Sequence, residues 1–410
     1  MSRRGANLPS IGEFNQSVVL DVIRMAPGGV SRVEIAAQTG LSSQTATNAT
    51  RRLLAAGLIR EGERTATGPG KPRTALHLVP EARSAIGIHL DPSFITYTVV
   101  DLAGAVVARA VTPTPRVLSP ADVVDSMVGS VEALVAEAHI DRDRLLGIGI
   151  AAPGPLDLER GTVDNPPLLP GWDGVPLRDA LGDALGMPVT LEKDVTAATI
   201  GELWSAGDPD RDDFAVLYIG TGVGLGIALD RSVRRGATSN LGDIGHLRVS
   251  HDGPLCACGN RGCLGENIAP ARLVREAAEA GAIAPVSLDD HDAVAAAYAE
   301  ACAAADDDAR VRTIVDGIAG DIATAVVLVA NLLDLADVVV SGAFWNHLAP
   351  VALTEIRRRV DASKAYVLPH PLRVGTSVVG ADATAVGAGC QVLSAVFAPS
   401  STPLLRPASA

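Results

Sequence analysis

Cysteine, long apolar segments and internal repeats are scarce in this 410-residue sequence, and each scarcity excludes a class of protein. Five cysteines are too few for a disulfide-stabilised secreted scaffold. No uninterrupted apolar run reaches the ~20 residues of a membrane-spanning helix, and the basic N-terminus precedes no apolar segment of the secretory type. No tandem repeat typical of a solenoid is present. We therefore expect a cytoplasmic protein without membrane spans, with two or three folded domains.

The charge is divided unevenly along the chain. Residues 1–80 contain ten Lys/Arg and five Asp/Glu, a net charge of +5, whereas the remainder has a net charge of −18 within the total of −13. A basic N-terminal part on an acidic body indicates that the first part binds a polyanion and the body has another task. The simpler alternative is uneven surface charge, so the motifs must decide.

The first eighty residues have the pattern of a DNA-binding domain. Apolar spacing predicts helices over 14–25, 31–38 and 42–56, with Ser31 and Ser42 as N-caps and a turn at Gly40. This is the helix-turn-helix pattern, in which polar side chains of the last helix reach the DNA bases and phosphates. The predicted contacts on that helix are Ser43, Gln44, Thr45, Asn48 and Arg51.

A basic Gly/Pro-rich segment follows these helices. Two short strands, 58–61 and 73–79, flank the loop 62–72 and predict a wing. A narrow cationic loop can follow a DNA groove, so Lys71 and Arg73 join the predicted DNA contacts. The alternative is a three-helix packing module without DNA affinity. The agreement of helix spacing, wing and local charge favours DNA binding.

The rest of the chain alternates between strands and helices, which predicts an α/β fold in two lobes. The meander 85–90, 95–100 and 105–109 precedes a helix at 122–139. A helix is also expected at 195–204. The further strands are predicted at 145–150, 189–192, 214–219, 226–229 and 338–340.

One imidazole and three thiols are spaced as a metal site. His246, Cys256, Cys258 and Cys263 form the pattern H-x9-C-x-C-x4-C, a ligand set that suits tetrahedral Zn²⁺. Four protein ligands leave no open position, so we expect structural rather than catalytic zinc. The alternative is a loop with three reduced cysteines. Cys302 and Cys390 lie in apolar stretches and are expected in the core.

Several segments together resemble the ROK family of repressors, unassigned frames and sugar kinases, over roughly residues 10–395. They are GIGIAAPGPLD (147–157), LEKDVTAATIGELW (191–204), GTGVGLGIALD (220–230), GDIGH (242–246) with the cysteines, and VVVSGAF (338–344). The resemblance implies an α/β chain with an N-terminal winged helix-turn-helix at 10–80, as in the repressor branch. It implies a two-lobed actin/hexokinase-like ATPase domain at 84–398. Lobe 1 is expected at about 84–190 plus 381–398, and lobe 2 at about 191–380.

The first phosphate loop departs from the family pattern. ROK kinases carry D-x-G-G-T, whose backbone amides hold ATP phosphates, whereas this chain has His89-Leu90-Asp91-Pro92-Ser93. The glycines are absent, and proline has no N–H to donate. Because phosphoryl transfer depends on positioning and charge stabilisation, we expect no enzyme activity. The second Gly-rich turn, 220–226, is either a phosphate loop or a hairpin turn that the fold needs anyway.

The sugar side of the resemblance is better preserved. Asp194 stands at the position of the family's catalytic base, although it could also cap its helix by accepting from the amides of Thr196 and Ala197. Asp243 replaces the family's glutamate, and Gly265 stands where the family has a glutamate after the last zinc cysteine. His246 in the family both ligates zinc and lies at the sugar. The implied effector contacts are Lys193, Asp194, Asp243 and His246.

Lys193 is one of only three lysines and replaces the family's sugar-binding asparagine. An ammonium binds anionic groups as a point charge, which favours a phosphorylated or acidic sugar. The alternative is a surface lysine paired with Glu192 or Asp194. The leading hypothesis is a sugar-responsive repressor, a homodimer or dimer of dimers on an inverted-repeat operator. A bifunctional sugar kinase and a repressor that docks a protein partner are the alternatives.

Overall fold

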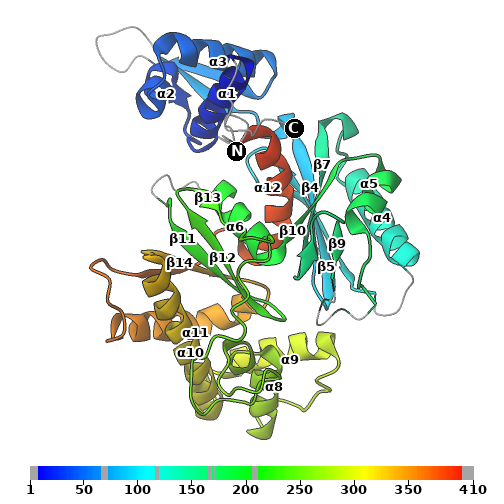
Figure 1. Ribbon diagram of the computed structural model, residues 1–410, viewed down its shortest axis with the longest axis vertical. Coiled ribbons are helices and arrows are strands. Elements are labelled where there is room, and N and C mark those ends of the chain that lie inside the picture. The colour runs from blue at the N-terminus through cyan, green and yellow to red at the C-terminus, as the bar shows by residue number, and fades with distance from the viewer. Residues whose placement is uncertain are drawn as a thin grey trace.

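The computed structural model describes residues 8–65, 73–115, 120–164, 166, 169, 171–205 and 211–398. Three sheets of three or more strands organise this part of the chain. Figure 1 shows the N-terminal helices at one end of the molecule, above two sheet-containing halves that flank helices α6 and α12. We call the N-terminal part the head and the remainder the body.

The head contains the three predicted helices. The side chain of Ser31 accepts from the amide of Glu34, whose carboxylate accepts from Ser31 N at 2.8 Å, so the predicted capping box is present. Ser42 caps the next helix through the amide of Thr45. A three-stranded sheet in the order β1-β3-β2 completes the head. Its elements are α1 Leu8–Arg24, β1 Val30–Ser31, α2 Arg32–Thr39, α3 Ser43–Ala55, β2 Ile59–Thr65 and β3 Arg73–Leu78.

The first wing strand is longer than predicted. The sequence places a loop from residue 62 onward, but β2 continues to Thr65 and pairs there with Arg73. The strand passes Gly62 through a register shift between Glu61 and Arg64, and a Cβ at Gly62 would lie 2.7 Å from the ring of His77 on the paired strand. A glycine therefore continues the strand where a side chain would collide. Lys71 lies outside the described residues.

The first body sheet has the strand order β10-β7-β4-β5-β6. Strands β4, β5 and β6 form the predicted antiparallel meander, while β7 and β10 run parallel to β4. Helices α4 and α5 cover one face, and α12 covers the other (Figure 1). The elements are β4 Ser84–Leu90, β5 Phe94–Asp101, β6 Val106–Pro113, α4 Pro120–Glu137, β7 Leu145–Ala152, the hairpin β8 Leu156–Asp157 and β9 Thr162–Val163, α5 Leu177–Leu185 and β10 Val189–Lys193.

The second body sheet repeats this arrangement in the order β13-β12-β11-β14-β15, with β14 parallel to β11. Helix α10 is long and apolar enough to cross a membrane, but more than half of its apolar stretch is buried inside this lobe. A core helix explains that composition. The elements are β11 Phe214–Ile219, β12 Val223–Leu229, β13 Ser232–Val233, α7 Leu264–Asn267, α8 Pro270–Glu279, α9 His291–Ala304, α10 Ala309–Leu333, β14 Asp337–Ser341, α11 Trp345–Asp361 and β15 Arg373–Thr376.

Helices α6 (Asp194–Ser205) and α12 (Ala383–Phe397) cross between the two sheets, and their backbones pack in direct contact. A Cβ at Gly387 would lie 1.7 Å from the carbonyl oxygen of Ala197, so glycine is required there. Strand β10 pairs with β7, which puts residues 191–193 in the first sheet rather than in the second lobe.

Cys302 and Cys390 are buried, as predicted.

Candidate functional site

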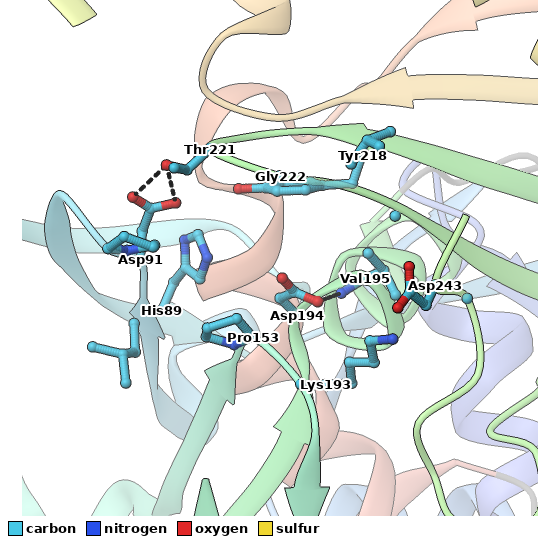
Figure 2. A pocket seen from close by; sticks show the side chains of 16 residues that line it. His89, Asp91, Pro153, Lys193, Asp194, Val195, Tyr218, Thr221, Gly222 and Asp243 are labelled. Carbon is cyan, nitrogen blue, oxygen red and sulfur yellow. Dashed lines mark hydrogen bonds between the residues drawn. The ribbon is translucent and has the colours of Figure 1, made fainter. Parts of the chain in front are cut away.

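A cavity of about 170 Å³ lies where the two body sheets face each other (Figure 2). It is smaller than the roughly 300–1,000 Å³ pockets of drug-sized ligands, and thus suits a small molecule. The parallel strands β4, β7 and β10 all point their carboxyl ends toward it, which is where α/β folds place their sites. The second lobe contributes the β11–β12 turn. The lining residues are His89–Pro92, Pro153, Gly154, Lys193–Val195, Tyr218, Thr221–Gly224, Gly242 and Asp243.

Three of the four predicted effector residues line this cavity: Lys193, Asp194 and Asp243. The carboxylate of Asp243 is exposed and accepts from the amide of Gly245 at 3.2 Å. His246 is not among the lining residues and is positioned with the cysteines instead. Sequence reasoning therefore identified the side of the cavity formed by the β10–α6 junction and Asp243, but not the side of Asp91.

Asp194 occupies the first position of α6, at the junction with β10. Its Oδ1 accepts from the amide of Val195 at 2.7 Å, so the alternative in which Asp194 caps the helix through Thr196 and Ala197 is wrong. Burial raises the pKa of Asp194 to about 6, against the opposing effects of the Val195 hydrogen bond and the charge of Lys193. A carboxyl group whose pKa is perturbed in a cleft is typical of functional sites.

Lys193 is buried rather than on the surface. Its ammonium donates to the carbonyl oxygen of Asn240 at 3.1 Å, so the alternative of a surface lysine paired with Glu192 or Asp194 is wrong. Glu192 pairs instead with Arg235 at 2.6 Å. An ammonium has three donors, and the bond to Asn240 uses one of them at the cavity wall.

Asn240 connects the two lobes beside Lys193. Its carboxamide oxygen accepts from the amide of Leu156 at 2.8 Å, and its nitrogen donates to the carbonyl of Leu156 at 3.0 Å. The side chain thus pairs with the backbone of the first lobe as a neighbouring strand would. Sequence reasoning did not identify Asn240, because its partner is 84 residues away.

A second contact between the lobes lies at the other end of the cavity. Thr221, in the β11–β12 turn, donates to the carboxylate of Asp91, with distances of 3.1 and 3.3 Å to its two oxygens (Figure 2). Asp91 is buried in the loop after β4 and also accepts from the amide of Ser93. In the resemblance described above, this loop and this turn are the two phosphate loops. Here an acidic side chain joins them.

Two rings line the wall beside Asp91. His89 and Tyr218 meet edge to face, with ring centroids 6.1 Å apart. Burial lowers the pKa of His89, which favours the neutral imidazole despite the charges of Asp91 and Asp382. The pKa of Tyr218 is raised, first by burial and then by Asp91 and Asp194, so its hydroxyl remains protonated at neutral pH. Thus the carboxylate of Asp91 faces two uncharged rings.

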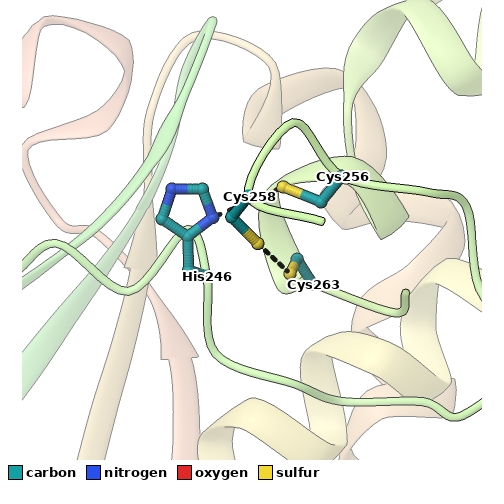
Figure 3. A group of neighbouring side chains, drawn as sticks. All are labelled: His246, Cys256, Cys258 and Cys263. Atoms are coloured by element: carbon teal, nitrogen blue, oxygen red, sulfur yellow. Dashed lines mark hydrogen bonds between the residues drawn. The ribbon is translucent and has the colours of Figure 1, made fainter. Parts of the chain in front are cut away.

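The predicted metal ligands come together in one cluster (Figure 3). Their ligand atoms all lie within 4.8 Å of one another. His246 Nδ1 is 3.4 Å from Cys256 Sγ, and Cys258 Sγ is 3.6 Å from Cys263 Sγ. Tetrahedral zinc requires about 3.6 Å between nitrogen and sulfur ligands and about 3.8 Å between two sulfurs, so the four residues fit the ion.

The surroundings of Cys258 favour metal binding, whereas burial and the neighbouring thiols raise the pKa of Cys263 to about 12, so a metal would have to displace that proton. Hydrogen bonds from the backbone and side chain of Asn260 lower the pKa of Cys258 to about 6, which favours the thiolate that zinc needs. Bound zinc would join the loop that carries Asp243 and His246 to the loop 256–263. Figure 3 shows the second nitrogen of His246 directed away from the cysteines.

The predicted DNA-contacting side chains of α3 share one face of the head. Ser43, Gln44, Asn48 and Arg51 are exposed, whereas Thr45 is half-buried beside Ser42. Gln44 donates to Asn48 at 3.1 Å, one helical turn away. Arg73 begins β3 in the wing.

Comparisons with known proteins agree with this architecture. Residues 85–394 match the ROK family and residues 13–67 match the MarR family. A putative xylose repressor of Caldicellulosiruptor sp. (strain Rt8B.4) is 26% identical over 95% of this chain and 97% of its own. The structure of a ROK family transcriptional regulator, a homologue of the Escherichia coli Mlc protein, covers 94% of this chain and 98% of its own with a TM-score of 0.71 and 24% identity.

A kinase structure is also similar. A ROK family glucokinase from Streptomyces griseus, solved with glucose and AMPPNP, is 27% identical, with a TM-score of 0.61 over 75% of this chain and 98% of its own. The chain belongs to the ROK family. With its MarR-type winged helix, it falls in the transcriptional-repressor branch, and the predicted fold class is confirmed.

Proposed function

We propose that this protein represses transcription by binding an operator with its winged helix, and that a sugar or sugar derivative in the body cavity weakens that binding. The observation that carries the proposal is the cavity itself. Asp194, Lys193 and Asp243 line one side of the cavity. On the other side, the hydrogen bond between Asp91 and Thr221 joins the loop after β4 to the β11–β12 turn. The chain thus combines a ligand cavity and a DNA-binding head.

The same geometry supports a role without catalysis. A phosphate cradle consists of backbone amides or cations directed at the anion. The loop after β4 offers instead the carboxylate of Asp91, which would repel a phosphate, and Pro92, which has no amide hydrogen. We propose that the cavity takes the sugar but does not support phosphoryl transfer.

We propose that the effector is a sugar whose hydroxyl groups donate to the carboxylates of Asp194 and Asp243. The putative xylose repressor that this chain resembles is named for a sugar, and the glucokinase structure holds glucose. The remaining donors of Lys193 favour a phosphorylated or acidic derivative. His246 would meet the effector at the edge of the cavity through the nitrogen directed away from the cysteines.

On the DNA side, we propose that the exposed polar face of α3 enters the major groove, and that the wing with Lys71 and Arg73 follows the backbone. Gln44 and Asn48 carry the groups that recognise adenine, whereas Arg51 suits phosphate or guanine. A two-fold homodimer, or a dimer of dimers, would bind an inverted repeat in the cytoplasm. We divide the chain into a head at 10–80 and a body at 84–398.

We propose that zinc is structural, held by His246, Cys256, Cys258 and Cys263. Bound zinc would cross-link two loops. It would not catalyse a reaction, because four protein ligands leave no position for water or substrate. Asp243 and His246 lie on the same short segment, so the metal would fix the position of one effector-binding carboxylate.

The proposal is tested by measuring DNA binding and phosphorylation with one preparation. An operator is selected from a random duplex pool, and its affinity is measured during titration with D-xylose, D-glucose, N-acetylglucosamine and their phosphates. We expect one of these sugars to release the operator from wild type but not from Asp194→Ala. Selection of no sequence, or turnover of a sugar with ATP at ~1 s⁻¹ or faster, would overturn the proposal.

The kinase alternative has one observation in its favour. The raised pKa of Asp194, about 6, suits a general base that takes a proton from a sugar hydroxyl. An ATP-dependent phosphorylation assay decides between the two functions. The alternative in which the body docks a protein partner predicts instead that no sugar alters operator affinity.

A further inference from the structure

Helix α6 connects the effector cavity to the head. Its first residue, Asp194, lines the cavity, and Trp204, near its other end, packs against the head. Twelve residues at 1.5 Å per residue give a helix of about 18 Å. The two functional parts of the protein thus contact opposite ends of one helix.

At the head end, the contact is made by Arg24, the last residue of α1. Its guanidinium lies 4.3 Å from the centroid of the Trp204 ring and donates to the carbonyl oxygen of Trp204. It also pairs with Asp21 on its own helix. The Trp204 indole donates in turn to the carbonyl of Leu102 at 3.2 Å, which fixes the ring.

The end of α6 is a favourable place for a cation. The last carbonyls of a helix have no intrahelical partner and carry the negative end of the helix dipole, so a cation there stabilises the helix. Only 6% of the Arg24 side chain is exposed, and the low local dielectric strengthens both its hydrogen bond and its cation–π contact. Arg24 therefore caps α6 from another domain.

The middle of α6 is packed closely between β12 and the Gly242 segment on one side and α12 on the other. A Cβ at Gly226 would lie 1.8 Å from Thr199 Oγ1, and one at Gly242 would lie 3.3 Å from the Val195 side chain. Gly242 directly precedes the cavity residue Asp243. On the opposite side, Gly387 of α12 meets the backbone of Ala197. Packed elements of this kind shift as units rather than deform.

We propose that Arg24 is a positioning residue that couples the head to the cavity by holding the C-terminal end of α6. A ligand that moves the Asp194 end of the helix shifts the carbonyl and ring on which α1 rests, and so reorients the recognition helix α3, which packs on α1. This coupling rests on the proposed function for its physiological meaning, but its physical content needs no identified effector.

Amide hydrogen exchange of the full-length protein tests the coupling from both ends. In Arg24→Gln, we expect exchange to accelerate about tenfold or more in the last turn of α6 and also at the cavity end, residues 195–199, because a charge-assisted cap is lost. In Asp194→Asn, which leaves the head untouched, we expect altered exchange in residues 19–24 of α1. Arg24→Lys, which keeps the charge but loses the planar stack, should be intermediate.

Arg32→Gln is the matched control. Arg32 is also an arginine of the head, but it bonds Thr50 at 3.2 Å and Glu61 at 2.8 Å, both within the head. Its loss should change exchange in the head alone. Changes in Arg24→Gln that stop at the last turn of α6 would overturn the coupling. So would transmission in one direction only, because coupling between two sites is reciprocal.

The same preparations separate failure of the coupling from failure of the proposed function. Wild type that selects no operator would refute the repressor function, while the exchange data would still decide the coupling. Operator binding with a full effector response in Arg24→Gln would leave the function intact and refute the coupling.

Discussion

Replacing Asp194 with asparagine should stabilise the body at neutral and alkaline pH. Burial raises the folded-state pKa of this carboxyl group from 3.8 to about 6. The folded protein therefore holds the proton more tightly than the unfolded chain. As the pH rises from about 4 to about 6, the unfolded state releases its proton first. The free energy of unfolding of wild type therefore falls between pH 4 and 6 and stays lower at higher pH. Asparagine cannot ionise and avoids this loss.

The size of the effect follows from the shift. Two pKa units correspond to about 3 kcal/mol at pH 8. The side chain is partly open to the cavity, so solvent screening reduces the expected gain to about 1–3 kcal/mol. For a body of this size, that is an increase in Tm of about 2–6 °C. The carboxamide oxygen that Asp194→Asn introduces can still accept the hydrogen bond from Val195, so this contact does not offset the gain.

The assay is thermal unfolding of wild type and Asp194→Asn at pH values from 4 to 8, followed by the difference in Tm. The difference should be small at pH 4, grow up to about pH 6 and then level off. Asp243→Asn removes an exposed carboxylate from the same cavity and serves as the control. A Tm difference for Asp194→Asn that does not change with pH, or that falls as pH rises, would refute the reasoning.

Four further predictions concern the metal, the DNA contacts and the cavity. Cys258→Ser should lower zinc from one ion per chain to well below that by elemental analysis; wild type without zinc would contradict the site. Gln44→Ala should reduce discrimination between operator and random DNA. Lys71→Ala should weaken binding to both DNAs alike and reduce the slope of log affinity against log salt concentration by about one. An equal loss of affinity for both DNAs in Gln44→Ala would show that Gln44 does not recognise the sequence. Lys193→Asn should shift calorimetric affinity from phosphorylated toward neutral sugars, and an unchanged ratio would remove the ammonium from the site. Thr221→Val should break the contact with Asp91 and increase proteolytic cleavage of the β11–β12 turn. Unchanged cleavage would show that this contact does not hold the turn against the first lobe.

The features that the sequence could predict depend on local spacing. The four zinc ligands fall within eighteen residues, and the helix caps Ser31 and Ser42 act three residues ahead. Strand and helix periodicity likewise operates over a few turns or pleats. Such signals are readable because the chain has little freedom over short distances.

The features that escaped prediction join residues far apart in the chain. Thr221 is 130 residues from Asp91, Asn240 is 47 residues from Lys193, and Trp204 is 180 residues from Arg24. No periodicity links such pairs, because the register of whole sheets decides which side chains meet. The loss of glycines around Asp91 was visible in the sequence, but not that its carboxylate would bond to the opposite loop.

Helix α12 has a consequence for how the protein is made. It covers β4, β5 and β7 and crosses α6, yet it is translated after all of them. The head can complete its own core while the ribosome is still producing the body, since its elements are contiguous within residues 8–78. The body sheet, in contrast, keeps an apolar face uncovered until the last helix emerges. Nascent chains should therefore pass through a stage in which the DNA-binding head is folded and the body is not. Chaperones would be needed most at this stage.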